Sequence, residues 1–270
     1  MAEWKNLDTL ASYKKLSEVK AVELKKVMSG ESGAERVAKY SVPIAEGLTY
    51  NFAAKRVDDD VLAVLAEMAE EAQLTGKYKE LYNGAMINTG EKRLVLHQLT
   101  RGQLGDDVIA DGVNKRAFYK EQQDRIAAFA EDVHAGKITN AAGEKFTTVV
   151  QIGIGGSDLG PRAVYIALEN WAKVNDTLKM KAMFISNVDP DDASAVLASI
   201  DVAHSIFVLV SKSGTTLETL TNESFVKDAL KEKGLDPAKH MIAVTSETSP
   251  LAKSSDYLAA FFMDDYIGGR

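Results

Sequence analysis

The chain of 270 residues contains no cysteine. This absence excludes a disulfide scaffold and thiolate metal sites, and it fits a reducing compartment. Basic residues are also in the minority, since 32 Lys and Arg stand against 39 Asp and Glu, for a net charge of −7. Such a balance is atypical of nucleic-acid-binding proteins, so any phosphate must be recognised by a local arrangement of donors.

Long apolar runs are absent as well. No stretch is long enough to span a bilayer, and the first residues lack the basic and apolar regions of a secretion signal. Hydrophobic residues make up 46% of the chain and charged residues 26%, which is ordinary for a soluble globular protein. We therefore expect a cytoplasmic protein with no membrane contact and no nucleic-acid partner.

The N-terminal part of the chain is expected to be helical. Apolar residues recur near helical spacing over 7–28, whereas 31–40 is polar and predicts a loop or a short helix. The segment 43–57 is weakly apolar without a firm period. The acidic triplet at 58–60 precedes a helical pattern, and we interpret it as a helix cap rather than a metal site because acidic groups oppose the positive end of the helix dipole.

From residue 146 onward, short apolar runs alternate with helical patterns. The expected strands are 147–152, 181–186, 205–210, 241–245 and 261–263, and the expected helices between them are 158–170, 190–199, 215–233 and 249–258. Such alternation predicts a parallel sheet covered on both faces. We expect a helical N-terminal region over 1–112 and, over 113–270, a doubly wound three-layer α/β/α domain that opens with a helix at 114–135.

The loop Gly153–Pro161 follows the first of these strands, at the strand end where parallel sheets bind ligands. Three interpretations of this loop are open. In the first, Gly153 and Gly155 fit a dinucleotide fingerprint, but Asp158 stands at the third glycine position. Asp189, a candidate ribose acid, serves equally well as a helix cap. The loop could also be a tight turn without a ligand. We favour the third interpretation, in which Ser157 contacts a sugar phosphate.

The segment Ser211–Thr219 is the most informative part of the chain. Six of its nine side chains end in a hydroxyl or an ammonium, and it lies between an expected strand and an expected helix. Hydroxyls, a lysine and free backbone N–H groups at a helix N-terminus form a receptor for a phosphate dianion. The phosphate contacts would come from Ser211, Ser213 and Thr216, with Thr219 as a further candidate.

The same segment also has the spacing of a capping box, with Thr215 followed three residues later by Glu218. Capping and phosphate binding are compatible, because a cap needs only some of the hydroxyls. No cap requires the cation of Lys212. The segment lacks the spacing of a Walker motif, which argues against nucleotide triphosphate hydrolysis.

A third segment, Asn88–Arg101, contains His97. A single histidine in an apolar stretch is more often a hydrogen-bonded core residue than a catalyst. The other histidines, at positions 134, 204 and 240, lie near the ends of expected elements and have no metal-ligand spacing. We expect no metal site.

These three segments in this order, followed by Gly268-Gly269-Arg270, resemble the signature stretches of the glucose-6-phosphate isomerase family. That family is built from two sugar-isomerase (SIS) domains. The resemblance implies that this chain contains the N-terminal helices and the first SIS domain, and that the second SIS domain is absent. The Asn88–Arg101 segment also separates it from SIS-type regulators and aminosugar enzymes, which share only the domain fold.

The family interconverts an aldose 6-phosphate and its ketose isomer through a cis-enediolate. By this resemblance, the phosphate ligands are Ser157, Ser211, Ser213 and Thr216, with Thr219 as a further candidate. Lys212 lies beside the substrate, Gly156 shapes the adjoining wall, and Arg270 stabilises the enediolate, a role that suits arginine because it stays protonated. The catalytic glutamate, the ring-opening histidine and a late lysine of the family fall beyond Arg270. The resemblance also implies a homodimer and no organic cofactor.

Two hypotheses about the chain stay open. In the first it is the N-terminal half of an isomerase, inactive alone because the base for proton transfer is missing. In the second it is a complete, non-catalytic module that binds sugar phosphates; a split enzyme completed in trans is a further alternative. If a second domain normally packs on this one, we expect the isolated chain to expose a large apolar patch. One local departure from the family is that Gly214 and Leu217 replace bulkier or polar residues, which affects the stiffness of the loop.

Overall fold

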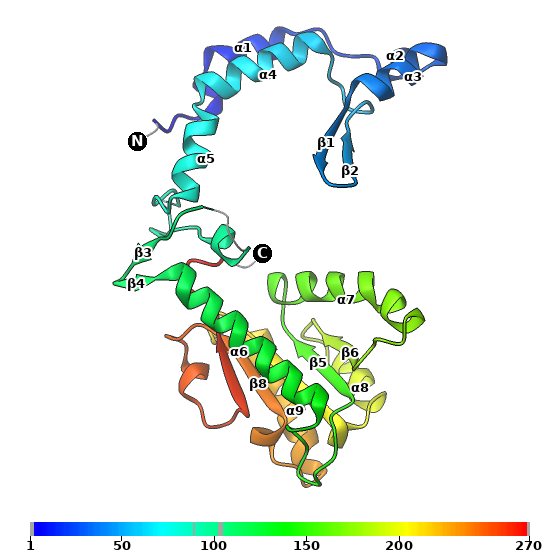
Figure 1. The fold of residues 1–270 in the computed structure, drawn as a ribbon, viewed down its shortest axis with the longest axis vertical. Coiled ribbons are helices and arrows are strands. Elements are labelled where there is room, and N and C mark those ends of the chain that lie inside the picture. The colour runs from blue at the N-terminus through cyan, green and yellow to red at the C-terminus, as the bar shows by residue number, and fades with distance from the viewer. Residues whose placement is uncertain (1–2, 89, 102–104, 269–270) are drawn as a thin grey trace. The chain divides into compact units, whose positions relative to one another are not determined.

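The computed structural model describes residues 3–88, 90–101 and 105–268. The chain divides into two compact units, Met1–Tyr82 and Asn83–Arg270, whose elements are labelled in Figure 1. Among the described residues, no helix has the length and apolar character needed to cross a bilayer.

The first unit consists of short helices and one hairpin. In chain order its elements are η1 (Leu7–Thr9), α1 (Ala11–Glu18), α2 (Leu24–Val27), α3 (Gly30–Lys39), β1 (Ser41–Ala45), β2 (Leu48–Asn51), α4 (Asp59–Glu71) and α5 (Leu74–Tyr82). The segment 7–28, where helical spacing was expected, is helical in three short elements rather than continuously. A tertiary contact fixes the start of α1. The Glu71 carboxylate accepts hydrogen bonds from the N–H groups of Ala11 and Ser12, both at 2.9 Å.

A buried arginine explains why the polar segment before the hairpin is helical. Arg36 of α3 is 8% exposed, and its guanidinium donates to the carbonyl oxygens of Ala53, Lys55 and Val57 at 2.8, 3.1 and 2.6 Å. The hairpin that follows is exposed along both strands, so no burial period was imposed on its sequence. The acidic cap is confirmed: the Asp58 side chain accepts from the Val61 N–H at 3.0 Å.

The second unit contains the parallel sheet. Its elements are η2 (His97–Thr100), β3 (Ile109–Ala110), β4 (Val113–Asn114), α6 (Lys115–Ala135), β5 (Thr148–Ile152), α7 (Gly156–Val174), β6 (Lys181–Ile185), α8 (Pro190–Ala198), η3 (Val202–His204), β7 (Ser205–Val210), α9 (Leu217–Glu232), η4 (Pro237–Lys239), β8 (Met241–Thr245), η5 (Pro250–Lys253) and β9 (Ala259–Phe262). The alternation of strands and helices expected from residue 146 onward is confirmed as far as β8.

The five strands are parallel and lie in the order β6-β5-β7-β8-β9. The chain therefore builds outward from β5 in both directions, and the switch point of the sheet lies between β5 and β7. At the carboxyl ends of these two strands Ile152 pairs with Leu209. The loops that leave β5 and β7 are therefore neighbours at the position where such sheets bind ligands.

Helices cover both faces of the sheet, as the doubly wound prediction requires (Figure 1). On one face α8 and α9 pack on the sheet, and side chains such as Phe207, Leu209, Val226 and Leu230 are completely buried. On the other face α6 contributes Val133 to a second core. Helix α7 reaches that face through Tyr165, whose hydroxyl accepts a hydrogen bond from the Ala182 N–H at 3.1 Å.

The prediction of a helix over 249–258 is wrong. Only the short 3-10 turn η5 forms, and the chain then runs toward β9. Ser254 stops the turn, because its backbone is extended and its hydroxyl accepts from the Asp256 N–H at 3.1 Å.

The two compact units divide at Tyr82, ahead of the domain boundary expected near residue 112. The segment 83–112 belongs to the second unit because Leu96, Leu99 and Val108 pack with Tyr119 of α6. The start of the SIS domain at 113 stays a prediction.

Candidate functional site at the switch point

The loop between β5 and α7 is a tight turn that requires glycine at two positions. A Cβ on Gly153 would lie 2.7 Å from the Ser157 carbonyl oxygen. Gly155 has a φ of 57° and precedes the first residue of α7. The turn therefore places Gly156 and Ser157 in the first turn of a helix, at the carboxyl end of β5, where backbone N–H groups favour an anion.

Two acidic residues bear on the dinucleotide interpretation, Asp158 at the third glycine position and Asp189 as the candidate ribose acid, and both have structural partners. Asp158 is 3% exposed and forms an ion pair with Arg162 at 2.9 Å. Asp189 caps α8 by accepting a hydrogen bond from the Asp191 N–H at 2.9 Å, which confirms the cap interpretation.

The loop after β7 is organised by its own hydroxyl groups. Ser211, which is 3% exposed, donates from its hydroxyl to the Thr216 hydroxyl at 3.3 Å and accepts from the Gly214 N–H at 3.2 Å. Ser213 is exposed and accepts from the Thr215 hydroxyl at 3.0 Å. Ser211 and Thr216 thus lie together at the start of α9, with Ser213 on the open side of the loop.

The expected capping box does not form. Helix α9 begins at Leu217, and its N-cap residue is Thr216, whose side chain makes no capping hydrogen bond. The Thr215 hydroxyl is directed to Ser213 instead. The first N–H groups of α9 are therefore left without a side-chain cap, as an anion-binding helix terminus requires. Thr219 is 1% exposed and is the least accessible of the proposed phosphate ligands.

Lys212 connects this loop to the C-terminal segment. Its ammonium donates to the carbonyl oxygens of Asp265 and Ile267 at 3.3 and 3.2 Å. His97 holds the same segment, with its Nε2 2.9 Å from the Gly268 carbonyl oxygen. Parts of three predicted motifs thus meet at one edge of the sheet. Arg270, the proposed enediolate residue, lies outside the described residues.

The structure adds supporting residues that the sequence patterns did not indicate. Thr245, at the end of β8, donates from its hydroxyl to the Ser211 carbonyl oxygen at 2.7 Å. Asn222 of α9 donates to the Asn187 carbonyl oxygen at 3.0 Å, which ties α9 to the loop after β6. Thr245 could have been noticed in the sequence only as the last residue of an expected strand. Asn222 could have been noticed only as lying one helical turn after Thr219.

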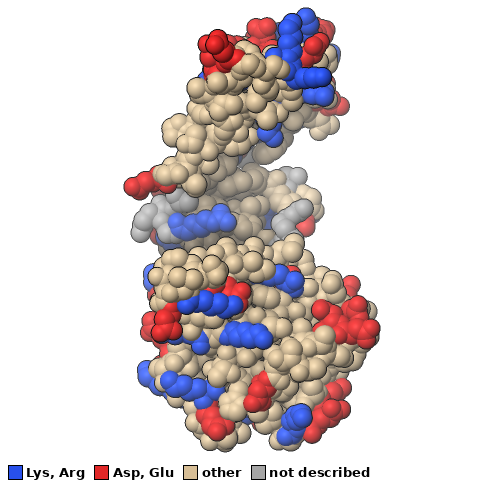
Figure 2. All heavy atoms as spheres, turned by 90° about the vertical axis from the view of Figure 1, so that its right-hand side faces the viewer, with Lys and Arg blue, Asp and Glu red and all other residues tan. Residues whose placement is uncertain are grey.

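The electrostatic setting is mixed. On the face shown in Figure 2, basic and acidic side chains are interspersed and neither sign forms a continuous area. A cavity of about 450 Å³ lies at the carboxyl ends of β8 and β9, lined by Ser246, Thr248 and the buried ion pair of Lys115 and Asp264. Within the described residues, no cluster of His, Asp or Glu has the arrangement of a metal site.

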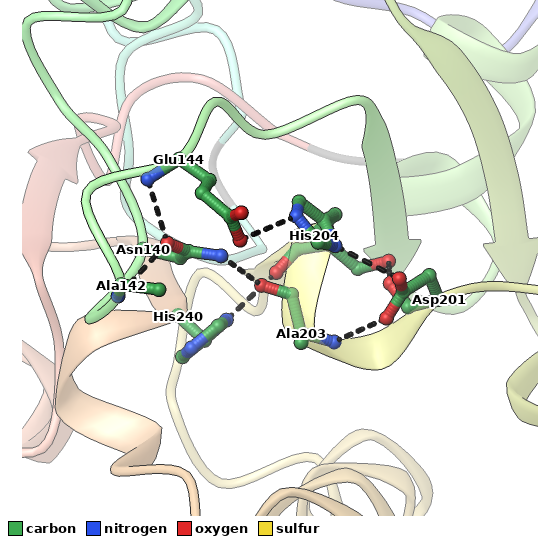
Figure 3. A network of polar contacts seen from close by, with 8 residues as sticks. Asn140, Ala142, Glu144, Asp201, Ala203, His204 and His240 are labelled. Carbon is green, nitrogen blue, oxygen red and sulfur yellow. Dashed lines mark hydrogen bonds and ion pairs between the residues drawn. The ribbon is translucent and has the colours of Figure 1, made fainter.

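A histidine bridge lies at the opposite, amino-terminal edge of the sheet (Figure 3). His204 places Nδ1 2.8 Å from Asp201 and Nε2 2.9 Å from Glu144. The hydrogen bond with Asp201, reinforced by Glu144, raises the pKa of His204 above 6.5. Because this cluster is remote from the switch point, we assign it a structural role.

The fold is that of a doubly wound α/β protein. At the carboxyl edge of its sheet, the switch point is formed by a glycine turn and a hydroxyl-rich loop. The chain belongs to the phosphoglucose isomerase family, whose model matches residues 51–270. The resemblance stated from the motifs is thereby confirmed.

Relatives and a solved structure agree with this family. A glucose-6-phosphate isomerase of Treponema denticola is 56% identical over 273 residues, which cover 99% of this chain and 51% of that protein. One from Treponema pallidum is 52% identical over 271 residues, with the same coverage of 99% and 51%. The crystal structure of a glucose-6-phosphate isomerase from Chlamydia trachomatis superposes with a TM-score of 0.82 at 36% identity, covering 98% of this chain and 50% of that one. The chain spans about half the length of the curated relatives it matches.

Proposed function

We propose that this chain is the phosphate-binding half of a glucose-6-phosphate isomerase, which interconverts glucose 6-phosphate and fructose 6-phosphate in glycolysis and gluconeogenesis. The observation that carries the proposal is the meeting of the 153–157 and 211–216 loops at the β5–β7 switch point in a chain of this family. The whole enzyme would be a cytoplasmic homodimer without a metal or an organic cofactor.

In this proposal the substrate phosphate binds to the hydroxyls of Ser157, Ser211, Ser213 and Thr216 and to the uncapped start of α9. The Thr219 hydroxyl is a secondary ligand. Hydrogen bonds to a dianion are stronger than neutral ones, at roughly 1.5–3 kcal/mol each. Gly156 leaves room for the sugar beside this anchor.

The chemistry needs charge stabilisation and a base. Lys212 contributes positive charge beside the sugar, and Arg270 would stabilise the enediolate without competing for its proton. The carboxylate that moves the proton between C1 and C2 would come from the second half of the enzyme. We therefore expect the 270-residue chain alone to bind phosphosugar weakly and to show no turnover.

Calorimetric titration of the 270-residue chain with glucose 6-phosphate tests the binding site. Thr216→Ala and Ser211→Ala should each weaken binding about tenfold, whereas Ser199→Ala, at the far end of α8, should not. Equal affinity of Thr216→Ala and the parent chain would contradict the assigned loop. A coupled assay with turnover well above background would contradict the expected inactivity.

The competing proposal, a complete non-catalytic binding module, is distinguished by the intact mass of the protein isolated from its source. A mass near twice the 29.3 kDa of this chain supports the isomerase half. A mass of 29.3 kDa supports the module or a split enzyme.

A further inference from the structure

Helix α7 contains a proline at a position where an α-helix normally uses a backbone N–H. Pro161 lies inside α7, past its first turn. The N–H at this position would donate to the carbonyl oxygen four residues earlier, which is that of Ser157. Proline has no N–H, and its ring also pushes that carbonyl outward from the helix. The Ser157 carbonyl oxygen therefore lacks its regular helical donor.

A side chain of the preceding strand supplies a donor to this oxygen. Strand β5 leads into α7 through the glycine turn (Figure 1), and Gln151 of β5 donates from Nε2 to the Ser157 carbonyl oxygen at 2.5 Å. The same oxygen would lie 2.7 Å from a Cβ on Gly153. Gly153 thus leaves room for the oxygen, Pro161 leaves it without a helical donor, and Gln151 provides the donor.

Gln151 is a polar residue in an apolar part of the sheet. It lies on the same face of β5 as Val149, which packs against the second core. Its neighbours on the two adjacent strands are Phe184 of β6 and Val208 of β7. A half-buried amide in such surroundings costs free energy unless it is hydrogen-bonded. The hydrogen bond to Ser157 offsets that cost and couples the side chain of Gln151 to the first turn of α7.

The main chain of Ser157 is held at both of its polar groups. Its N–H donates to the Ile154 carbonyl oxygen at 3.1 Å, and its carbonyl oxygen accepts from Gln151. Within residues 3–88, 90–101 and 105–268, the Ser157 hydroxyl has no hydrogen-bond partner. A fixed backbone with an unpaired hydroxyl suits a binding site, because little further ordering is needed when a ligand arrives.

We propose that Gln151 is the positioning residue for Ser157, and that its hydrogen bond sets the direction in which the Ser157 hydroxyl meets the substrate phosphate. The proposal rests on the proposed function, which assigns the phosphate to Ser157. Gln151 acts through the backbone of Ser157 and is not itself a phosphate ligand. Without the amide donor, the carbonyl would turn toward water and rotate the residue that carries the hydroxyl.

NMR spectroscopy tests the hydrogen bond without any ligand. Gln151→Met removes the donor with little change in side-chain volume, so the carbonyl carbon resonance of Ser157 should move upfield. Adding Pro161→Ala should return the resonance toward its parent position, because alanine restores the helical N–H. Tyr165→Phe is the matched control, since it removes a different hydrogen bond between α7 and the sheet, the one from the Ala182 N–H.

Calorimetric titration of the same variants with glucose 6-phosphate measures the consequence for binding. Gln151→Met should bind about tenfold more weakly, and Gln151→Met/Pro161→Ala should bind within about threefold of the parent. Tyr165→Phe should bind as the parent does. A role limited to stabilising α7 would instead produce equal losses of affinity in Gln151→Met and Tyr165→Phe. Melting temperatures measured alongside establish that each variant is folded during the titration.

Two results would overturn the proposal. One is a Gln151→Met chain with the affinity of the parent. The other is a loss of affinity that persists in the double variant although its Ser157 resonance has returned. Failure of the proposed function has a different signature: the parent chain would not bind glucose 6-phosphate, while the Ser157 resonance would still respond to Gln151→Met and to the restored N–H. That result would contradict the phosphate site and leave the hydrogen bond that orients Ser157 in place.

Discussion

The ammonium of Lys212 donates a hydrogen bond to the carbonyl oxygen of Ile267, 3.2 Å away. A side chain of the β7 loop thereby fixes the backbone of the last described segment. The same ammonium also reaches the carbonyl oxygen of Asp265 at 3.3 Å. Lys212, itself proposed to lie beside the substrate, is thereby engaged with the segment that precedes Arg270 in the sequence.

Replacing Lys212 with methionine should therefore have two effects. Residues 265–268 lose the two hydrogen bonds from the Lys212 ammonium and should exchange amide hydrogens faster. Glucose 6-phosphate should bind about tenfold more weakly, because a positive charge beside the anion is lost. Hydrogen–deuterium exchange and calorimetry measure the two effects. Lys239→Met, on the exposed η4 turn at the other edge, is the matched control. Faster exchange with unchanged affinity would restrict Lys212 to a structural role.

Substitution of Gly214 should destabilise the phosphate loop. Gly214 has a φ of +65°, and a Cβ there would lie 2.1 Å from the Ser249 hydroxyl oxygen. Gly234 has a similar φ of +71° with no atom within 4 Å of the added Cβ. Gly234→Ala therefore isolates the backbone cost, about 1–2 kcal/mol, and Gly214→Ala should cost more.

Urea unfolding measures both variants, and calorimetry with glucose 6-phosphate separates them further. Only Gly214→Ala should weaken phosphate binding, because its clash displaces the loop. Equal losses of stability in the two variants would show that the loop moves away from Ser249 without cost.

The strands and helices of the second unit were predicted well from the sequence, because there the pattern of apolar residues reflects the burial of the side chains. Strands β5, β7 and β8 have only buried and half-buried residues along their whole length, so their apolar runs were unambiguous. The first unit was predicted poorly because tertiary contacts decide it. The start of α1 depends on the Glu71 carboxylate, and α3 depends on the buried guanidinium of Arg36, neither of which has a local sequence signal.

For the site, residue types at strand ends were sufficient to locate the two loops but not to assign their internal hydrogen bonds. The spacing of Thr215 and Glu218 indicated a capping box, yet the Thr215 hydroxyl binds Ser213. The partners of Lys212 and His97 are carbonyl oxygens of a segment distant in the sequence, and no spacing rule predicts such contacts.

The buried ion pair of Lys115 and Asp264 should be costly to break. The two groups lie 3.1 Å apart with side chains 11% and 7% exposed, and the Tyr119 hydroxyl donates to Asp264 at 2.9 Å. Burial raises the pKa of Tyr119, and Asp264 adds to that effect, so the hydroxyl stays a donor. Asp264→Ala leaves the ammonium buried without its partner, at a cost of about 3–5 kcal/mol.

Urea unfolding followed through Trp171, in a Trp4→Phe background, reports on the second unit alone. The double variant Lys115→Met/Asp264→Leu should recover part of the loss, because no charge remains buried. Asp124→Ala removes the exposed partner of Lys120 and should cost roughly 0.5 kcal/mol or less. A loss from Asp264→Ala as small as that of the surface pair would refute this prediction.

The histidine bridge predicts a pH-dependent stability of the second unit. Folding raises the pKa of His204 above 6.5 because Asp201, and then Glu144, accept hydrogen bonds from its ring. A raised pKa means that the stabilisation is complete below pH 6.5 and is lost as the pH rises through the folded-state pKa. At the acid end, the hydrogen bond from His204 holds the pKa of Asp201 below 3.8, so that part is lost as the pH falls through the folded-state pKa of Asp201.

Thermal unfolding of the parent and of His204→Gln, at about pH 6 and about pH 9, tests the bridge through the fluorescence of Trp171. The parent should exceed the variant in melting temperature by a larger margin at the lower pH, because the imidazolium binds both carboxylates only while it is protonated. Asp201→Asn combined with Glu144→Gln should reduce the same margin. His134→Gln is the control, since His134 is exposed and has no carboxylate partner among the described residues. A margin independent of pH would mean that His204 contributes through neutral hydrogen bonds alone.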